Sequence, residues 1–120
     1  MFQTLTFTWD ASAAQDPLLE CKLPRGITIL AVSYCPQSHT GSPTNSNIDI
    51  VDDGVDVISA IAVATAGTPT LWKSKAVGGT NAPVFVAVDS ILGVALNFSG
   101  GTSPTAVDGA VVIYYAPGAV

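Results

Sequence analysis

Residues 48–61 constrain the fold of this 120-residue chain more than any other stretch. Two runs rich in isoleucine and valine flank Asp53-Gly54, and an Asx-Gly pair between strand-like runs is a strong hairpin signal. Gly54 accepts a positive φ because it has no Cβ, and Asp53 tolerates one better than most residues do. Because side chains alternate along a strand, Ile48 and Ile50 are expected on one face. We therefore predict a hairpin here, with the rest of an all-β domain assembled around it.

The composition agrees with a β fold. Charged residues make up only 11% of the chain, against about 25% in typical domains, and the helix formers Glu, Lys, Arg and Gln are scarce. Polarity comes instead from 12 Thr, 10 Ser and 11 Gly, of which threonine favours strands and glycine interrupts them. The chain shows no internal repeat and no linker, so residues 1–120 are predicted to form one antiparallel β-sandwich domain.

Several other segments have strand character. Residues 2–9 alternate clearly, with Leu5, Phe7 and Trp9 on one side and threonines on the other. Residues 26–35 are apolar on both faces, which predicts a central strand that Pro36 ends. The remaining strands are expected at residues 18–23, 55–65, 70–77, 84–88, 91–98 and 107–115, with 84–88 and 91–98 paired around Asp89-Ser90. For residues 60–66 a short helix is the alternative to a strand.

Polar connections are expected at residues 10–17, 78–83 and 99–105, and the longest one at residues 36–47. A polar loop as long as the last is uncommon in a small domain unless it binds something or moves.

The charge balance limits the classes of molecule that this protein can bind. Four basic residues against nine acidic ones give a net charge of −5, so the basic patch that nucleic acid requires is missing. An anionic membrane surface is equally unfavourable. Few charges also mean a poorly solvated surface, which favours burial against like subunits or a larger partner. The first residues lack the pattern of a secretory signal, and residues 57–72 contain Gly67 and Pro69 and do not resemble a membrane-spanning helix.

Catalytic and metal-binding motifs are weak. Asp49, Asp52, Asp53 and Asp56 lie close together, but they lack the spacing of an EF-hand, so a solvated turn is favoured over a cation site. His39 is the only histidine and has no nucleophile elbow near it. The glycine-containing loops match no nucleotide-binding pattern. The sequence therefore predicts neither an enzyme nor a bound cofactor.

The cysteines and aromatic residues have structural interpretations. Cys21 and Cys35 are expected to be buried reduced thiols, with a disulfide as the alternative. Trp9 and Tyr34 are expected in the core. Trp72, in a short segment between Thr and Lys residues, is the candidate for a surface anchor.

The chain resembles small structural proteins of tailed bacteriophages, most closely the head decoration (cement) proteins. The resemblance rests on Asp52-Asp53-Gly54 in a mid-chain hairpin, on residues 97–105 (Asn-Phe-Ser-Gly-Gly-Thr-Ser-Pro-Thr) before a terminal apolar strand, and on the neutral Thr/Ser/Gly/Ala surface. It implies a jelly-roll-like sandwich, made in the host cytoplasm, that forms a homotrimer on the capsid exterior and bridges neighbouring major capsid proteins. Decoration proteins share no catalytic residues, so none is transferred.

The function expected from this resemblance is mechanical stabilisation of the phage head. Contacts with the shell are predicted at one end of the sandwich, through His39, Thr40, Ser103 and Thr105, with Trp72 as an anchor. Two alternatives remain. One is a tail or fibre module of a phage, and the other is a carbohydrate-binding module in which Trp72 and a tyrosine form an aromatic platform.

Overall fold

The structure, a computed structural model that describes residues 3–118, consists of β-strands and one 3₁₀ turn, which confirms the all-β prediction. The elements are β1 (Gln3–Ser12), β2 (Gln15–Lys22), β3 (Ile27–Thr40), β4 (Asn45–Asp52), β5 (Val55–Val63), β6 (Thr70–Lys73), η1 (Lys75–Val77), β7 (Val84–Val86), β8 (Ile91–Ser99) and β9 (Thr105–Pro117).

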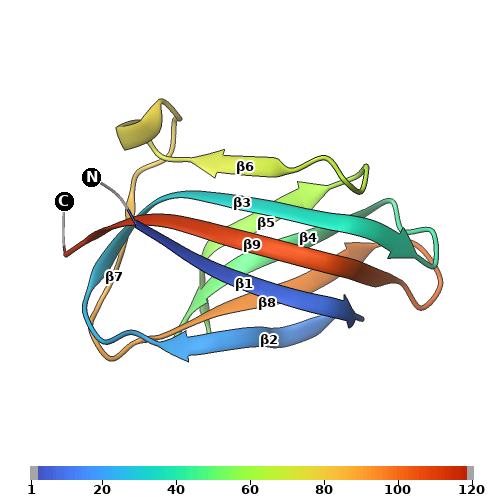
Figure 1. The fold of residues 1–120 in the computed structure, drawn as a ribbon, viewed down its shortest axis with the longest axis horizontal. Helices are drawn as coiled ribbons and strands as arrows, with labels where there is room; N and C mark the ends of the chain where they lie inside the picture. The colour runs from blue at the N-terminus through green and yellow to red at the C-terminus, as the bar shows by residue number, and fades with distance from the viewer. Residues whose placement is uncertain (1–2, 119–120) are drawn as a thin grey trace.

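The strands form two antiparallel sheets that pack face to face (Figure 1). The five-stranded sheet has the order β1-β9-β3-β6, and β7 pairs with the same edge of β3 as β6 does, nearer the start of β3. The four-stranded sheet has the order β2-β8-β4-β5. Pairing is nested around the turn between β4 and β5: β3 pairs with β6 and β7, β2 with β8, and β1 with β9. One long hairpin wrapped into two facing sheets is a jelly roll, so the predicted jelly-roll-like β-sandwich is confirmed.

The central hairpin forms as predicted. Asp53 and Gly54 have φ values of 49° and 83°, the positive values that a two-residue type I′ turn requires. Ile48 pairs with Ile61, and register shifts interrupt the ladder on both sides of Ile50. In space the hairpin lies at one side of the four-stranded sheet, because β5 is an edge strand. The hairpin is central only in the sense that the other strand pairs, taken in sequence order, enclose it.

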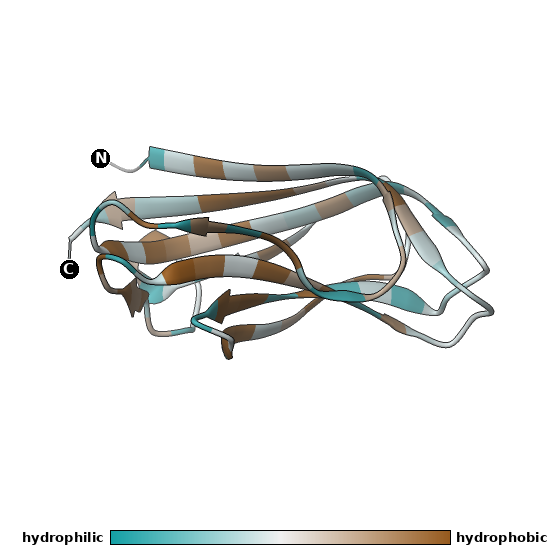
Figure 2. Ribbon diagram, turned by 90° about the horizontal axis from the view of Figure 1, so that it is seen from below, coloured by the Kyte–Doolittle hydropathy of each residue, from teal (hydrophilic) through white to brown (hydrophobic). Residues whose placement is uncertain are grey.

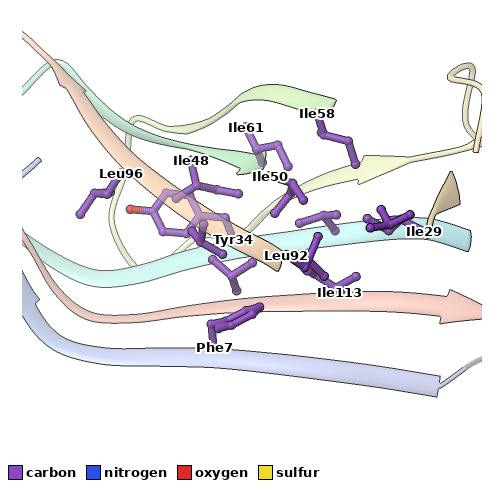
Figure 3. Packing of buried hydrophobic residues seen from close by; sticks show 14 of the residues in the cluster. Phe7, Ile29, Tyr34, Ile48, Ile50, Ile58, Ile61, Leu92, Leu96 and Ile113 are labelled. Carbon is purple, nitrogen blue, oxygen red and sulfur yellow. The ribbon is translucent and has the colours of Figure 1, made fainter. Parts of the chain in front are cut away.

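The core lies between the sheets and draws on both of them. Side chains with no exposed surface include Ile29, Val32 and Tyr34 from β3, and Ile48 and Ile50 from β4. Figure 3 shows Tyr34 surrounded by isoleucine and leucine side chains of both sheets. Hydrophobic and hydrophilic bands alternate along several strands in Figure 2, as expected for strands with one buried face. Burial of each large apolar side chain contributes about 1.5–3 kcal/mol.

The prediction that Pro36 ends its strand is wrong. β3 continues to Thr40, and Pro36 lies opposite Gly109 of β9. β6 begins at Thr70, opposite Tyr34, so beyond Tyr34 β3 has a strand neighbour on one side only, where a proline can be accommodated. The predicted loop 36–47 is therefore reduced to residues 41–44, and His39 and Thr40 belong to a strand.

Two other predicted connections differ from those in the structure. Residues 10–17 are mostly strand, and only Ala13 and Ala14 connect β1 to β2 across the two sheets. Residues 84–88 and 91–98 do not form a pair. β7 lies in the five-stranded sheet and β8 in the other, with residues 87–90 crossing between them. Sequence proximity suggested a hairpin here, but β8 pairs with β2 and β4, and β7 covers the free edge at the start of β3.

The other expected strands are confirmed with changed bounds, and residues 70–77 are strand only as far as Lys73, after which η1 follows. Residues 2–9 fall in β1, apart from Phe2, which lies outside the described residues, and residues 107–115 fall in β9. The alternative of a helix at residues 60–66 is not observed, because β5 extends to Val63. Both cysteines are free thiols, half-buried rather than fully buried, with Cys21 in β2 and Cys35 in β3.

Candidate interaction surfaces

The outer face of the five-stranded sheet carries few charges. Thr6, Val112, Ser33 and Leu71 are direct neighbours across β1, β9, β3 and β6, and they form a row on this face. Thr6 and Leu71 are exposed at the two ends of the row, whereas Val112 and Ser33 are half-buried between them. We call this surface the neutral face.

A second row of the neutral face has the same character. Thr4, Tyr114, Ala31 and Lys73 are neighbours across the same four strands, and Lys73 is the only charged member. A shallow apolar hollow of about 240 Å³ lies between Leu71, Tyr114, Lys73 and Ala31. Neutral side chains of modest size desolvate at low cost, so this face is suited to contact another protein.

The outer face of the four-stranded sheet is acidic, and we call it the acidic face. Asp49 in β4 accepts hydrogen bonds from the backbone N–H of Ala60 at 2.7 Å and from the Asn97 side chain at 3.3 Å. The pKa of Asp56 is raised above its ordinary value of 3.8 by partial desolvation and then by the negative charges of Asp49 and Asp16. Carboxylates that raise one another's pKa repel each other, so this face opposes contact with a second acidic surface.

The four predicted contact residues at the end of the sandwich do come together. Thr40 and Thr105 are opposite one another, with their hydroxyl groups 2.5 Å apart. Gly41 approaches the backbone of Thr102 so closely that a Cβ there would collide with the Thr102 carbonyl oxygen. The segments 41–44 and 100–104, which include the exposed Ser103, therefore form one packed loop cluster.

At this end of the sandwich, His39 takes part in a chain of hydrogen bonds. Its Nε2 lies 2.7 Å from Ser46 Oγ, which is also 2.6 Å from the hydroxyl group of Tyr34. Ser46 and Tyr34 have no exposed surface, so this hydrogen-bonded chain joins β3 to β4 inside the sandwich. Burial lowers the pKa of His39, and it raises the pKa of Tyr34 to about 12. The buried Ser46 hydroxyl cannot reach a substrate, and the three side chains connect the two sheets.

Trp72 lies apart from the loop cluster. It is opposite Val32, seven residues before His39 on β3, which at roughly 3.3 Å per residue places it about 23 Å away along the strand. The indole is half-buried and packs against the core. Trp72 is therefore less exposed than expected for a surface anchor. Its free side lines a groove of about 320 Å³ between β5 and β6, together with Thr70, Thr80 and Asn81.

Two of the four aspartates of residues 49–56 accept hydrogen bonds from backbone N–H groups. Asp53 accepts a hydrogen bond from the N–H of Ile91 at 2.8 Å, as Asp49 does from Ala60. Within residues 3–118, no three His, Cys, Asp or Glu side chains converge in a way that could hold a metal ion. In the same range, no helix has the length and hydrophobicity needed to cross a membrane.

Sequence reasoning missed the separation of charge between the two sheets. The aspartates of residues 49–56 gave a partial signal, since they cluster on one hairpin. The pairing of β8 with both β4 and β2 places this hairpin in the same sheet as Asp16 and Glu20, and it could not be derived from the sequence.

No protein-family model and no curated protein matches this chain. Among solved structures, it is similar to chains in the crystal structures of the T13 IBDV viral particle and of the infectious bursal disease virus VP2 subviral particle. Sequence identity is 17% in both cases, with TM-scores of 0.39 and 0.38. The matches cover 94% of this chain but only 31% and 32% of those chains, so it spans about a third of their length. Similarity of this size establishes neither a common family nor a common function.

Proposed function

We propose that this protein is a non-enzymatic structural component of a virion, a head decoration protein of the tailed-bacteriophage kind. In this role it binds the exterior of the capsid as a homotrimer and bridges neighbouring major capsid proteins. The observation that carries the proposal is the neutral face, whose two rows of side chains cross four strands with Lys73 as their one charged member, on a protein whose other sheet is acidic. The neutral face is the docking surface, and the acidic face is directed away from the partner.

The mechanism is multivalent. A trimer that engages several capsid subunits converts the second and third contacts into intramolecular events, so modest individual contacts add up to tight attachment. Because the trimer binds the assembled shell and not separated capsomers, binding stabilises the shell by mass action.

The predicted contact residues supplement the neutral face. Thr40, Ser103 and Thr105 offer hydroxyl groups at the loop cluster, with His39 behind them. The half-exposed indole of Trp72, in the groove between β5 and β6, is a further proposed contact with the shell.

The experiment compares two charge insertions. Heads assembled from the major capsid protein of the same virus are mixed with the purified protein and sedimented. The double variant Thr6→Glu/Leu71→Glu places two charges on the neutral face, and Val55→Glu/Ile91→Glu places the same charges on exposed positions of the four-stranded sheet, away from the Trp72 groove and the loop cluster. A charge must be desolvated when an interface covers it, so we expect the first variant to bind at least tenfold more weakly and the second to bind normally. Equal binding by both variants would contradict the docking surface.

Analytical ultracentrifugation tests the head assignment separately. A stable trimer supports a decoration protein, whereas a hexameric ring indicates a tail tube, the other virion role that fits the same surface.

A carbohydrate-binding module is the second candidate, because the groove at Trp72 combines an aromatic ring with hydroxyl and amide groups. Specific binding on a glycan array that Trp72→Ala abolishes would favour it. Trp72→Phe is the matched control, since it keeps an aromatic ring and the packing against the core.

A further inference from the structure

The four edges of the two sheets are protected to different degrees. Exposed edges invite pairing with another strand, and proteins commonly protect them with prolines, bulges, charges or short strands. The β2 edge contains Pro17 and Lys22 and has a shift in register. The β5 edge has two register shifts and a positive φ of 57° at Ala60. The edge made by β6 and β7 consists of strands of four and three residues.

β1 has none of these protections. It is ten residues long, contains no proline and no lysine, and pairs with β9 without a shift in register. Asp10, near its end, is its only charged residue. Its other edge has no strand neighbour among the described residues. β1 therefore presents a long and regular row of backbone groups with a single charged side chain, near its end.

A cavity opens beside the same edge. It has a volume of about 430 Å³ and lies between β1 and the end of β2, where the two sheets separate. The apolar part of its lining comes from Leu5, Cys21, Leu23, Ile27 and Tyr115. Pockets that hold ligands have volumes of about 300–1,000 Å³, so the cavity can receive a large side chain.

Arg25 supplies a charge at this cavity. It lines the cavity and is exposed. The one ion pair within the described part of the chain joins Lys22 to Asp89, so Arg25 has no carboxylate within ion-pairing distance there. A guanidinium group beside an apolar cavity is complementary to a carboxylate on the molecule that fills the cavity.

We infer that the β1 edge and this cavity form a binding site for an extended peptide segment of another protein. The segment adds to the five-stranded sheet as a strand alongside β1, places one bulky apolar side chain in the cavity, and presents an Asp or Glu carboxylate to Arg25. A second copy of the chain is a poorer occupant. Its own β1 directs Leu5, Phe7 and Trp9 toward its own core, which leaves no side chain for the cavity. The site does not depend on the shell-binding role.

The test uses a defined probe. An end-blocked octapeptide of alternating threonine and valine, with one leucine followed by one aspartate at its centre, is titrated into the full chain carrying Cys35→Ser. In that protein Cys21 is the only thiol, and it lines the cavity. Binding is expected to slow alkylation of Cys21 at least fivefold and to protect β1 backbone amides from hydrogen exchange. The β5 amides, on the far edge of the other sheet, are expected to stay unchanged.

Charge variants identify the carboxylate contact. Arg25→Glu is expected to weaken peptide binding at least tenfold, and Lys75→Glu, the same change at an exposed residue of η1, is expected to leave it unchanged. Replacing the peptide's leucine by glycine should abolish protection of Cys21. Absence of β1 protection at millimolar peptide, or equal binding by the two charge variants, overturns the proposal. Protection of β1 that rises with protein concentration in the absence of peptide assigns the edge to a second copy and also overturns it.

Discussion

The two sheets share one core but differ in the charge of their strands. The strands of the five-stranded sheet carry two acidic residues and one basic residue, Asp10, Asp108 and Lys73, a net charge of −1. The strands of the four-stranded sheet carry five acidic residues and one basic residue, Asp16, Glu20, Asp49, Asp52, Asp56 and Lys22, a net charge of −4. Inside, both sheets contribute isoleucine, valine and leucine to the same cluster. The two sheets therefore contribute alike to folding, while their outer faces differ as surfaces for contact.

The difference in charge affects which face can approach another acidic surface. Like charges repel over roughly a Debye length, about 8 Å at physiological salt. The acidic face thus resists close contact with another acidic surface, and the neutral face lacks this barrier. Orientation on a partner can follow from charge distribution alone, without a specific ion pair.

Truncation of the core should have the largest effect and tests whether the two sheets form one cooperative unit. Ile48→Ala in the four-stranded sheet and Ile29→Ala in the five-stranded sheet each remove a fully buried side chain. We expect each to lower the free energy of unfolding by about 2–5 kcal/mol in a single urea transition. Val112→Ala, at a half-buried site on the neutral face, is the control and should cost less. Two separate transitions would contradict a common core.

Removal of the hydroxyl group that links the sheets should have the next largest effect. Ser46→Ala leaves the buried hydroxyl of Tyr34 without its partner, so we expect a loss of about 1–3 kcal/mol by chemical denaturation. The double variant Ser46→Ala/Tyr34→Phe removes both polar groups and should recover part of that loss. Ser99→Ala, which removes an exposed hydroxyl from the same sheet, is the control. No recovery in the double variant would mean that the link is not a hydrogen bond.

Acidification should change the free energy of unfolding in opposite directions through His39 in one sheet and Asp56 in the other. The pKa of His39 is lowered by burial in the folded protein, so the unfolded chain binds the proton first as the pH falls through about 6.5. The free energy of unfolding should then decrease until the folded protein is also protonated. The pKa of Asp56 is raised, so near pH 4 the folded protein binds the proton first and the free energy of unfolding should increase.

Urea titrations at several pH values separate these contributions. His39→Gln should remove the decrease below pH 6.5, and Asp56→Asn should remove the increase near pH 4. Both effects should be modest, because the His39 ring is only half-buried and Asp56 is exposed. An unchanged pH profile in His39→Gln would show that another group causes the loss of stability.

The smallest effect is expected from the ion pair between Lys22 and Asp89. Its atoms are 3.8 Å apart, and its side chains are 67% and 74% exposed. Pairs this exposed contribute about 0–1 kcal/mol, so Asp89→Asn should change the free energy of unfolding by less than about 0.5 kcal/mol at moderate salt. Asparagine suits this position, where φ is 67°. A larger loss that disappears in high salt would indicate a stronger contribution from charge than the geometry supports.

Much of the fold could be predicted because its signals are local. Asp53-Gly54 determined a turn, and the alternation of Leu5, Phe7 and Trp9 determined which side of β1 packs inward. Predictions failed where segments distant in sequence determine the end or the partner of a strand. Pro36 was expected to end a strand, but β9 supports β3 beyond it. Residues 84–88 and 91–98 were paired because they are neighbours in sequence, whereas each found its partner elsewhere.

The candidate sites were less predictable for the same reason. His39, Thr40, Ser103 and Thr105 were assigned to one end of the sandwich, and the structure brings them together there. The sequence could not place Trp72 against the core, since that depends on β6 joining the edge of β3. The unprotected edge of β1 and the cavity beside it are visible only once the neighbours of each strand are known.

The sequence by itself determined that this chain forms strands, that it turns at Asp53-Gly54, and that it carries few charges, because these properties depend on each residue and its near neighbours. The tertiary structure alone decided which strands share a sheet, and with that the grouping of carboxylates on one face and neutral side chains on the other. Strand pairing depends on contacts between segments far apart in the chain, such as β1 with β9, which no short stretch of sequence encodes.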